Sequence, residues 1–347
     1  MLPEGVRIIT VTTVAFLGAL AVTPLWLLFL AKFGFGKRIR SSEEAPVFAK
    51  LHQKKSGTPN GGGVIIWGTV TVIALVLWGL GYLFGGIWDF LSFVSRAETY
   101  LPLAALVLAG SLGFLDDWFL AKKKGGAKSG GLTIRHKIVL YSGLAALGAW
   151  WFYFRLGFDA IQVPFYGTFT IGWWYIPIFM FILIASAFSA NETDGLDGLL
   201  GGVVLFAFLA LTAVAFVIGR HDLAVFGGAV IGALLAFLWY NIYPARFFMG
   251  DTGSMALGIT IGTIAMLTNS ALFLPFFAII LVIESLSVII QVSSKLIFKR
   301  KVFRSAPIHH HFEAIGWPES QVTMRFWIIS AMASVLGVLL YFLSRLF

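Results

Sequence analysis

The sequence predicts an all-α polytopic membrane protein with about ten transmembrane helices. Hydrophobic residues make up 59% of the 347 residues and charged residues only 12%, whereas about 25% of a soluble domain is charged. The hydrophobic residues form repeated blocks of about 20, the length that a helix needs to cross the apolar core of a bilayer. Barrel strands are excluded because the blocks are too long and do not alternate.

Ten hydrophobic blocks fit membrane spans. They lie near residues 8–31, 63–84, 99–119, 137–155, 172–190, 198–218, 222–240, 252–268, 270–297 and 323–346. We interpret the first block as a retained helix, because it is too long for the apolar region of a signal peptide and has no small-residue cleavage site. There is no internal repeat, and we expect one integral-membrane domain over residues 1–347.

The basic residues predict the orientation of these spans. Every lysine and arginine except Arg7, Arg96, Arg155, Arg220 and Arg345 lies in or beside a loop after the first, third, fifth, seventh or ninth span. The positive-inside rule therefore predicts that these loops are cytoplasmic and that both termini are outside. The same rule explains the net charge of +9 without a nucleic-acid partner. Residues 158–170 alternate in hydropathy and predict a small external hairpin.

Five of the eight aspartates lie at the predicted cytoplasmic ends of spans: Asp116, Asp117, Asp194, Asp197 and Asp251. His52 and the run His309, His310 and His311 lie in loops on the same side. Charge close to the membrane is costly and usually functional. We therefore predict an active site on the cytoplasmic face. The absence of cysteine excludes disulfides, thiolate metal sites and a cysteine nucleophile.

Consecutive acids on a helix point in different directions, because neighbouring side chains diverge by about 100°. Asp116 and Asp117 therefore predict two separate roles, such as a metal contact and a proton acceptor. The alternative is a solvated helix end, although acids at a helix C-terminus oppose the helix dipole.

The other aspartates also have structural alternatives. Asp194 and Asp197 are three residues apart and are expected to share a helix face, but they also precede an apolar run where acids cap a helix. Asp251 stands between glycines and suits either an N-cap or a metal or phosphate site. His309, His310 and His311 favour phosphate contacts with one proton shuttle.

Acids for a hard cation, basic groups for phosphate and glycines for close approach are typical of phosphoryl transfer with a bound metal. Oxygen ligands without thiolates favour Mg²⁺, or Mn²⁺, over zinc. At a membrane face, one substrate is expected to be a lipid phosphate and the other a water-soluble nucleotide.

Four segments resemble the phospho-N-acetylmuramoyl-pentapeptide transferase family, translocase I of peptidoglycan synthesis, within the polyprenyl-phosphate N-acetylhexosamine-1-phosphate transferase superfamily. They are FLDDW, ETDGLDGL, YNIYPARFFMGDTGS and RSAPIHHHFEAIGWPESQVTMRFWIIS. The resemblance extends from about Leu51 to the C-terminus. The triple histidine followed by GWPE distinguishes this branch from transferases that use UDP-GlcNAc.

The resemblance implies ten spans in the bacterial inner membrane, a cytoplasmic active site and usually a homodimer. It implies transfer of phospho-MurNAc-pentapeptide from UDP-MurNAc-pentapeptide to undecaprenyl phosphate, giving lipid I and UMP. The alternatives are a UDP-GlcNAc:undecaprenyl-phosphate GlcNAc-1-phosphate transferase, a non-catalytic homologue and, more remotely, a cation-coupled transporter or flippase.

The resemblance also implies residue roles. Asp251 would be the main Mg²⁺ ligand, Asp117 would support the metal, and Asp116 would be the base that deprotonates the lipid phosphate. Lys137 and the three histidines would hold phosphates, and Phe248 would stack on uracil. The remaining substrate contacts would come from Lys55, Thr58, Asn191, Asp194, Asp197, Asn241 and Gln291.

The sequence departs from the family pattern in one segment and at three single positions, and these departures leave the predicted reaction class unchanged. The segment TPNGGG, from Thr58 to Gly63, replaces TPTMGG. Leu120 stands where a lysine is common, Phe188 where an asparagine is frequent, and Glu192 where the residue is usually apolar.

Overall fold

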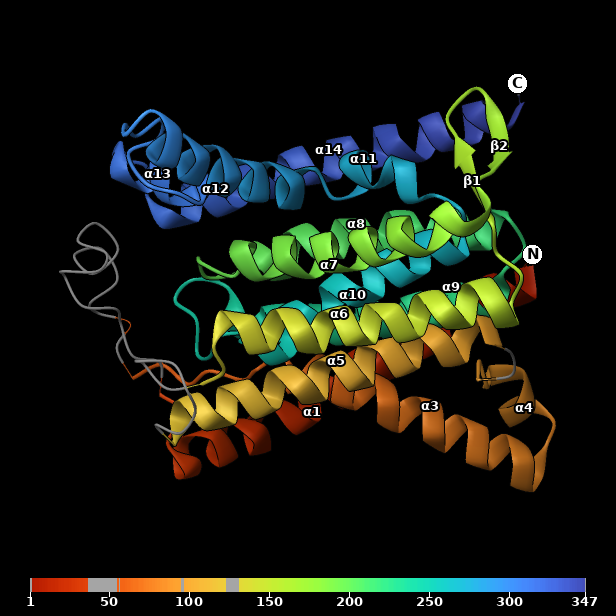
Figure 1. The fold of residues 1–347 in the computed structure, drawn as a ribbon. Helices are drawn as coiled ribbons and strands as arrows, with labels where there is room; N and C mark the ends of the chain where they lie inside the picture. Colours follow the sequence, from red (N-terminus) through yellow and green to blue (C-terminus); the bar gives the residue numbers. More distant parts are fainter. Residues whose placement is uncertain (1, 37–54, 56, 95–96, 123–130, 347) are drawn as a thin grey trace.

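The protein is an all-α bundle of roughly aligned helices in the computed structural model, which describes residues 2–36, 55, 57–94, 97–122 and 131–346 (Figure 1). The longer helices are α1 (Leu2–Phe33), α3 (Val64–Phe84), α5 (Ala97–Ala121), α6 (Ile134–Trp150), α7 (Tyr175–Thr193), α8 (Leu199–Val217), α9 (His221–Asn241), α10 (Asp251–Leu267), α12 (Ile279–Ile297) and α14 (Glu319–Leu346). The short helices are α4 (Ile87–Leu91), α11 (Leu274–Phe277) and α13 (Ile308–Ala314).

Each predicted span coincides with a helix over most of its length, and the polytopic all-α class is confirmed. Within the described ranges, eight helices are long and apolar enough to cross a membrane. Helices α6 and α10 are shorter, at 17 residues each. The number of ten spans and the positions of the termini stay predictions. The basic residues of segments 37–54 and 123–130, with Arg96 and His52, lie outside the described residues.

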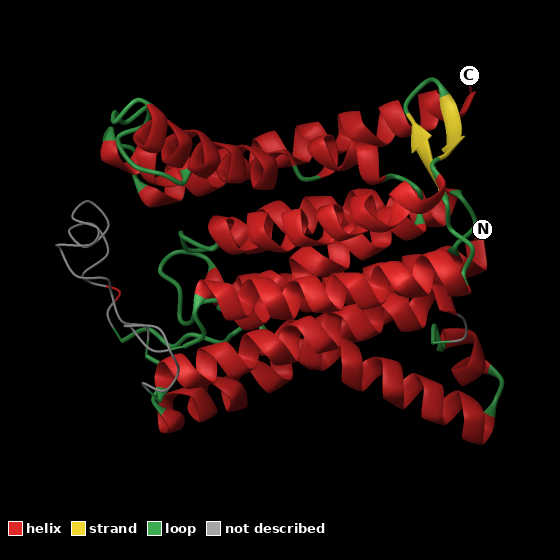
Figure 2. Cartoon of the chain, viewed as in Figure 1, coloured by secondary structure: helices red, strands yellow, loops and turns green. Residues whose placement is uncertain are grey.

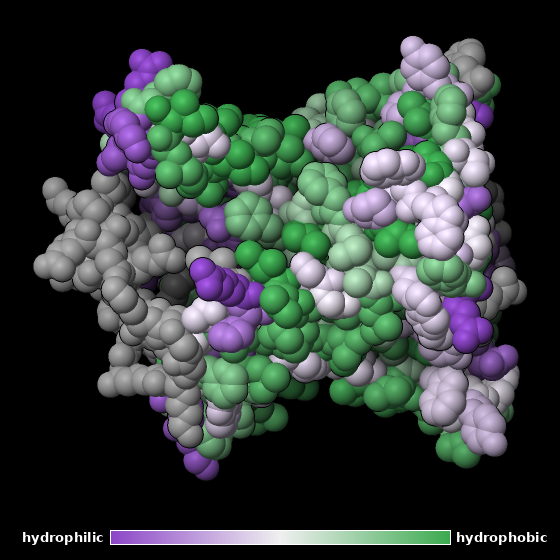
Figure 3. Space-filling model, in the orientation of Figure 1, coloured by the Kyte–Doolittle hydropathy of each residue, from purple (hydrophilic) through white to green (hydrophobic). Residues whose placement is uncertain are grey.

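The surface has an apolar band between two more polar ends (Figure 3). Leu25, Val139 and Met332 are 68%, 69% and 66% exposed on the outside of the bundle. A protein surrounded by water rarely exposes contiguous apolar surface of this kind. The band therefore fits contact with lipid chains.

Helix α10 lies inside the bundle, and every residue from Thr252 to Leu267 is buried. Helix α5 packs closely against the first turn of α10, and a Cβ at Gly113 would lie only 2.3 Å from the carbonyl oxygen of Asp251. Helix α9 packs in the same way on α1, where a Cβ at Gly232 would lie 2.1 Å from the carbonyl oxygen of Thr12. Glycine allows such close backbone contact. The contact at Gly113 brings Asp116 and Asp117 beside the start of α10.

The predicted span near 270–297 is not one continuous helix. The chain forms a short turn at Ala271–Phe273, then α11, and α12 begins at Ile279 after a non-helical Ala278 with φ −130° and ψ 40°. The Ser334 hydroxyl of α14 donates a hydrogen bond of 3.0 Å to the carbonyl of Phe277 at this break. The break is tolerated because a neighbouring helix satisfies the released backbone group.

The predicted hairpin at 158–170 is confirmed. Strands β1 (Ala160–Val163) and β2 (Gly167–Thr170) pair antiparallel, with Ala160 opposite Thr170 and Val163 opposite Gly167. They are the only strands in the described part of the chain (Figure 2). The predicted loop that carries the three histidines contains helix α13, which lies at the end of the bundle opposite the hairpin (Figure 1).

Candidate functional site

Two acids and a lysine from three helices meet at the end of the bundle where α13 lies. The Lys137 ammonium of α6 is 2.6 Å from Asp116 Oδ2 of α5 and also contacts Asp251 Oδ2 of α10. Asn191, near the end of α7, donates a hydrogen bond of 2.9 Å to Asp251 Oδ1. Residues from Asp116 to Asp251, which are 135 positions apart in the sequence, therefore form one polar centre, as the sequence predicted.

Asp117 has a different set of partners. Its Oδ1 accepts hydrogen bonds from Asn60 Nδ2 at 2.8 Å and from the backbone N–H of Asp251 at 3.3 Å. Its Oδ2 accepts from the backbone N–H of Thr252 at 3.1 Å. The first N–H groups of a helix have no partner within that helix. Asp117 therefore caps α10 from a neighbouring helix.

These contacts decide between alternatives that the sequence left open. Asp116 and Asp117 point to different partners, as predicted for consecutive helical residues, and α5 continues to Ala121. Their charge at the end of α5 is compensated by Lys137 and by the positive end of α10. Gly250 occupies the N-cap position of α10 and makes no side-chain cap. The carboxylate of Asp251 therefore interacts with Lys137 and Asn191 instead of capping its own helix.

The expectation that Asp194 and Asp197 share a helix face is wrong. Helix α7 ends at Thr193 and α8 begins at Leu199, and Asp194 has non-helical backbone angles of φ −77° and ψ 56°. Gly198 precedes α8 with φ +72°, a conformation that glycine adopts readily. The two acids lie in the turn between the helices. Asp194 Oδ2 accepts from Gly250 N–H at 3.1 Å.

Asp197 belongs to a second ionic cluster. It is 3% exposed, and its Oδ1 lies 2.5 Å from Lys55 Nζ. Lys55 also contacts Glu319 at the start of α14, whose Oε1 accepts from Asp197 N–H at 2.7 Å. The Phe248 ring is 8% exposed, with its centre 5.8 Å from Lys55 Nζ. Lys55 thus has two carboxylates and one aromatic ring around its ammonium.

The three histidines are consecutive on α13 and have separate partners. His309 Nδ1 lies 3.0 Å from Glu284 Oε2, and both side chains are fully buried. His310 Nδ1 lies 2.7 Å from Glu313 Oε2. His311 Nδ1 accepts from Arg304 N–H at 3.2 Å. The histidines therefore do not form a common metal site.

Burial is the largest single influence on His309 and disfavours its charged form, but the charge and hydrogen bond of Glu284, together with the charges of Glu313 and Glu192, outweigh it. The pKa of His309 is therefore raised above its usual value of 6.5. His309 Nε2 and Glu284 Oε1 are buried without a hydrogen-bond partner in the described structure. His309 Nε2 faces Gly195, where a Cβ would lie only 2.1 Å away. The turn with Asp194 and Asp197 thus packs directly on the histidine.

Asn241 and Gln291, two of the expected substrate contacts, hold backbone segments in this structure. Asn241 accepts from Gly198 N–H at 3.0 Å and donates to the carbonyl of Phe247 at 2.8 Å. Gln291 Oε1 accepts from Val302 N–H and Phe303 N–H, both at 3.0 Å. The Thr58 N–H donates to the Lys55 carbonyl at 3.2 Å. The roles of these residues in substrate binding stay predictions.

Sequence reasoning missed four residues of the site. Asn60 stands in the departing segment TPNGGG and donates to Asp117. Glu319 lies in the GWPE motif, but its partner Lys55 is 264 residues away. Glu284 is a single acid inside an apolar span, and this position was the one signal that could have indicated a role. Gly195 gave no signal beyond its place between two aspartates.

The polar centre with Asp116, Asp117, Asp251 and Lys137, called the acid centre below, has the donors that a hard divalent cation prefers. Asp116, Asp117 and Asp251 contribute three carboxyl groups beside the single ammonium of Lys137. Carboxylate oxygens are typical Mg²⁺ ligands. Among the described residues, no three acidic, histidine or cysteine side chains are already arranged around a common metal position. Lys137 stands between Asp116 and Asp251 and takes the place of a cation there.

Comparison with known proteins gives one consistent result. Residues 99–269 match the family described as glycosyl transferase family 4. Over 341 residues, the chain is 40% identical to the phospho-N-acetylmuramoyl-pentapeptide-transferase of Geobacillus thermodenitrificans, covering 97% of this chain and 98% of the relative. The protein of that name from Geobacillus kaustophilus gives the same identity and coverage. The one from Shouchella clausii is 39% identical over 342 residues, or 96% and 98% of the two chains.

Proposed function

The chain belongs to the phospho-N-acetylmuramoyl-pentapeptide transferase family, and from this premise we propose that it makes lipid I in peptidoglycan synthesis. It transfers phospho-MurNAc-pentapeptide from UDP-MurNAc-pentapeptide to undecaprenyl phosphate and releases UMP. The observation that carries this proposal is the convergence of Asp116 and Asp251 on Lys137 at one end of an apolar bundle. A lipid phosphate and a soluble nucleotide can meet at such an end.

The proposed reaction forms one P–O bond and breaks another. An oxygen of undecaprenyl phosphate attacks the β-phosphorus of the UDP-sugar, and UMP leaves with the electron pair of the broken bond. Asp116 is the proposed base that accepts the proton of the lipid phosphate. Its Oδ2 lies 2.6 Å from the Lys137 ammonium, so a cation that can bind phosphate lies beside the proposed base. When the phosphates enter, the Lys137 ammonium can stabilise their negative charge.

Mg²⁺ is the proposed metal, with Mn²⁺ as its substitute. Asp251 would hold it and Asp117 would support it, because both carboxylates lie beside the first turn of α10. The bound ion would neutralise part of the phosphate charge. Chelation is expected to stop UMP release and added Mg²⁺ to restore it. Unchanged release after chelation would refute the metal proposal.

The nucleotide-sugar is proposed to bind between the acid centre and the Lys55 cluster. Asn191 and Asp194 border the first, and Lys55, Asp197 and Phe248 form the second. Binding of a uracil to the Phe248 ring requires this largely buried ring to become accessible. The further contacts proposed for this substrate are Thr58, Asn241 and Gln291, and the phosphates are proposed to reach His309, His310 and His311.

We propose that the protein crosses the bacterial inner membrane ten times, with both termini outside and the acid centre on the cytoplasmic side. Support comes from the basic residues that lie at this end, among them Lys32, Lys55, Lys122, Lys137 and Arg246. Lys122 donates to the carbonyl of Phe33 at 3.2 Å and thereby connects the ends of α5 and α1. A homodimer is proposed from the family alone, and no nucleic acid is expected as a partner.

The closest alternative substrate is UDP-GlcNAc. Purified protein with Mg²⁺ and undecaprenyl phosphate should release UMP from UDP-MurNAc-pentapeptide and not from UDP-GlcNAc. If UMP were released only from UDP-GlcNAc, UDP-GlcNAc would be the substrate in place of UDP-MurNAc-pentapeptide. A transporter is disfavoured because Asp116, Asp117 and Asp251 lie at helix ends and are connected to one another, whereas coupling-ion sites of transporters lie near the bilayer midplane.

A further inference from the structure

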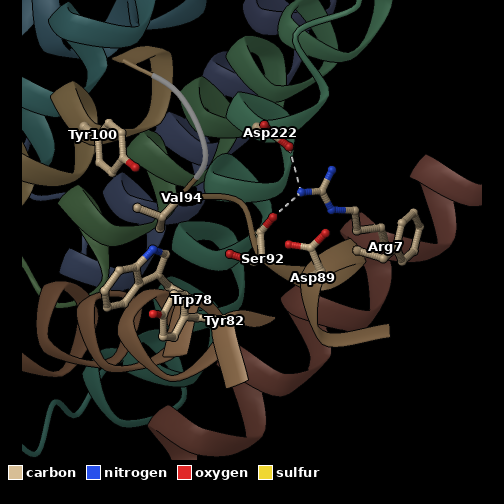
Figure 4. Close-up of a pocket in the computed structure, with 9 residues that line it drawn as sticks. Arg7, Trp78, Tyr82, Asp89, Ser92, Val94, Tyr100 and Asp222 are labelled. Atoms are coloured by element: carbon tan, nitrogen blue, oxygen red, sulfur yellow. Dashed lines mark hydrogen bonds and ion pairs between the residues drawn. The ribbon is translucent and has the colours of Figure 1, made fainter. Parts of the chain in front are cut away.

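A cavity of about 480 Å³ lies at the opposite end of the bundle from the acid centre. It is formed where α1, α5 and α9 begin and α3 ends, together with α4 and the residues after it. Its polar and aromatic lining includes Arg7, Trp78, Tyr82, Asp89, Tyr100 and Asp222 (Figure 4). Its size is within the range of small-molecule sites. None of these residues belongs to the proposed transferase site.

The charges of the cavity favour a cation over an anion. Arg7 is 6% exposed, and its guanidinium contacts Asp222 at 2.7 Å, Glu4 at 3.2 Å and the carbonyl of Ser92 at 2.7 Å. Asp89 is exposed and forms no hydrogen bond or ion pair within the described structure. The described residues that line the cavity thus include two carboxylates, Asp89 and Asp222, and one guanidinium, and Asp89 is the carboxylate that the guanidinium does not contact. The adjacent Arg220 and Glu98 pair at 3.1 Å is balanced.

Aromatic rings form one wall of the cavity. Trp78 and Tyr82 stack with their ring centres 6.4 Å apart, and Figure 4 shows Asp89 between this pair and Arg7. A ring face attracts an organic ammonium. Aromatic residues are also common at membrane interfaces without any ligand. That alternative accounts for the rings but not for a polar cavity with an unpaired carboxylate.

Arg7 supplies the second indication of a ligand. Its Nε is buried and has no hydrogen-bond partner in the described structure, although Nη1 and Nη2 are both paired. A buried unpaired donor is unfavourable. An oxygen that entered the cavity from the side of Asp89 would give this donor an acceptor. The cavity therefore suits a group with an ammonium and an acidic oxygen a few bonds apart.

Exposed apolar residues between the lining residues Tyr82 and Asp89 in the sequence indicate that this group belongs to a lipid. Leu83, Phe84 and Ile87 follow the Trp78 and Tyr82 pair along the chain and are 70%, 71% and 66% exposed. Such residues would contact acyl chains if the headgroup occupied the cavity. A water-soluble amine would gain nothing from them.

We propose that this cavity binds the headgroup of an aminophospholipid such as phosphatidylethanolamine. The ammonium lies against Asp89 and the rings of Trp78 and Tyr82, and a phosphodiester oxygen accepts from Arg7 Nε. The proposal does not depend on the transferase reaction.

The test compares lipids that remain bound to the full-length protein. Purified protein is incubated with equal amounts of phosphatidylethanolamine and phosphatidylglycerol, and bound lipid is counted by native mass spectrometry. A roughly two- to five-fold preference for phosphatidylethanolamine is expected, as for a cation–π contact at an exposed site. Asp89→Asn and Trp78→Leu should each abolish the preference. Asp159→Asn, on the hairpin at the same end, should keep it.

Equal retention of both lipids by the wild type would overturn the proposal, and so would an unchanged preference in Asp89→Asn. A further arm uses water-soluble phosphoethanolamine. If it displaces the lipid at equal concentration, the site recognises the headgroup alone and the assignment to a lipid is wrong. Melting temperature and UMP release, which should equal those of the wild type, verify that both variants are folded.

Discussion

Replacing Asp117 with asparagine should loosen the start of α10. The carboxylate is 3% exposed and accepts three N–H groups, from Asn60, Asp251 and Thr252. The single amide oxygen of asparagine can keep the contacts with Asn60 and Asp251. Its NH₂ group then faces the N–H of Thr252, which loses its acceptor inside the protein.

The expected cost follows from these contacts. A buried N–H without an acceptor costs about 1–3 kcal/mol, and the remaining bonds lose the benefit of a charged acceptor, about 1 kcal/mol. We therefore expect Asp117→Asn to lower the free energy of unfolding by about 2–4 kcal/mol. Solvent does not weaken these hydrogen bonds by screening, because Asp117 is buried.

The assay combines denaturation in detergent with hydrogen exchange. The unfolding midpoint of Asp117→Asn should fall, and the amides of Asp251 and Thr252 should exchange faster. Asp116→Asn is the matched control, because Asp116 accepts from Leu132 N–H and contacts Lys137 but not the α10 backbone. It should leave exchange at Asp251 and Thr252 unchanged. Unchanged protection of these amides in Asp117→Asn would refute the capping role.

Three further predictions concern other parts of the site. Lys137→Met should reduce the rate of UMP release at least about 100-fold, which is the effect of removing one group that stabilises transition-state charge. A smaller reduction would exclude a central role of Lys137 in the reaction. Gly195→Ala should also reduce UMP release, because the added Cβ would lie 2.1 Å from His309 Nε2. The control Gly143→Ala, with open space at its Cβ, should not reduce it. Equal rates of UMP release by the two variants would show that the position of the histidine is unimportant. The raised pKa of His309 means that its contact with Glu284 stabilises the fold fully below the unfolded pKa near 6.5 and that this stability is lost as the pH rises through the folded pKa. Denaturation across pH should therefore show the largest deficit of Glu284→Gln on the acidic side, and a deficit that grew toward alkaline pH would contradict the assignment.

The features that the sequence predicted well depend on local patterns. Long apolar blocks predicted the helices, because the bilayer core sets their length. The placement of aspartates at one end predicted a shared polar centre, and Asp116 and Asp251 indeed contact Lys137 together. Alternating residues predicted the hairpin at 158–170, and the strands pair from Ala160 to Thr170.

The features that it missed depend on distant partners. Ala278 is neither glycine nor proline, and the helix break there is stabilised by Ser334 from another helix. The cap of α10 comes from Asp117, 135 residues before Thr252, so the local sequence around Asp251 could not identify it. The spacing of Asp194 and Asp197 fits a helix, but Gly195 and Gly198, between and after them, favour the turn that the structure shows.

The acid centre as the site of lipid I synthesis is tested most directly by following the lipid product. Purified protein with UDP-MurNAc-pentapeptide, undecaprenyl phosphate and Mg²⁺ should form lipid I, detected by mass spectrometry. Asp159→Asn should form it at the wild-type rate, and a folded Asp251→Asn should form essentially none. Formation of lipid I by Asp251→Asn at the wild-type rate would contradict the account.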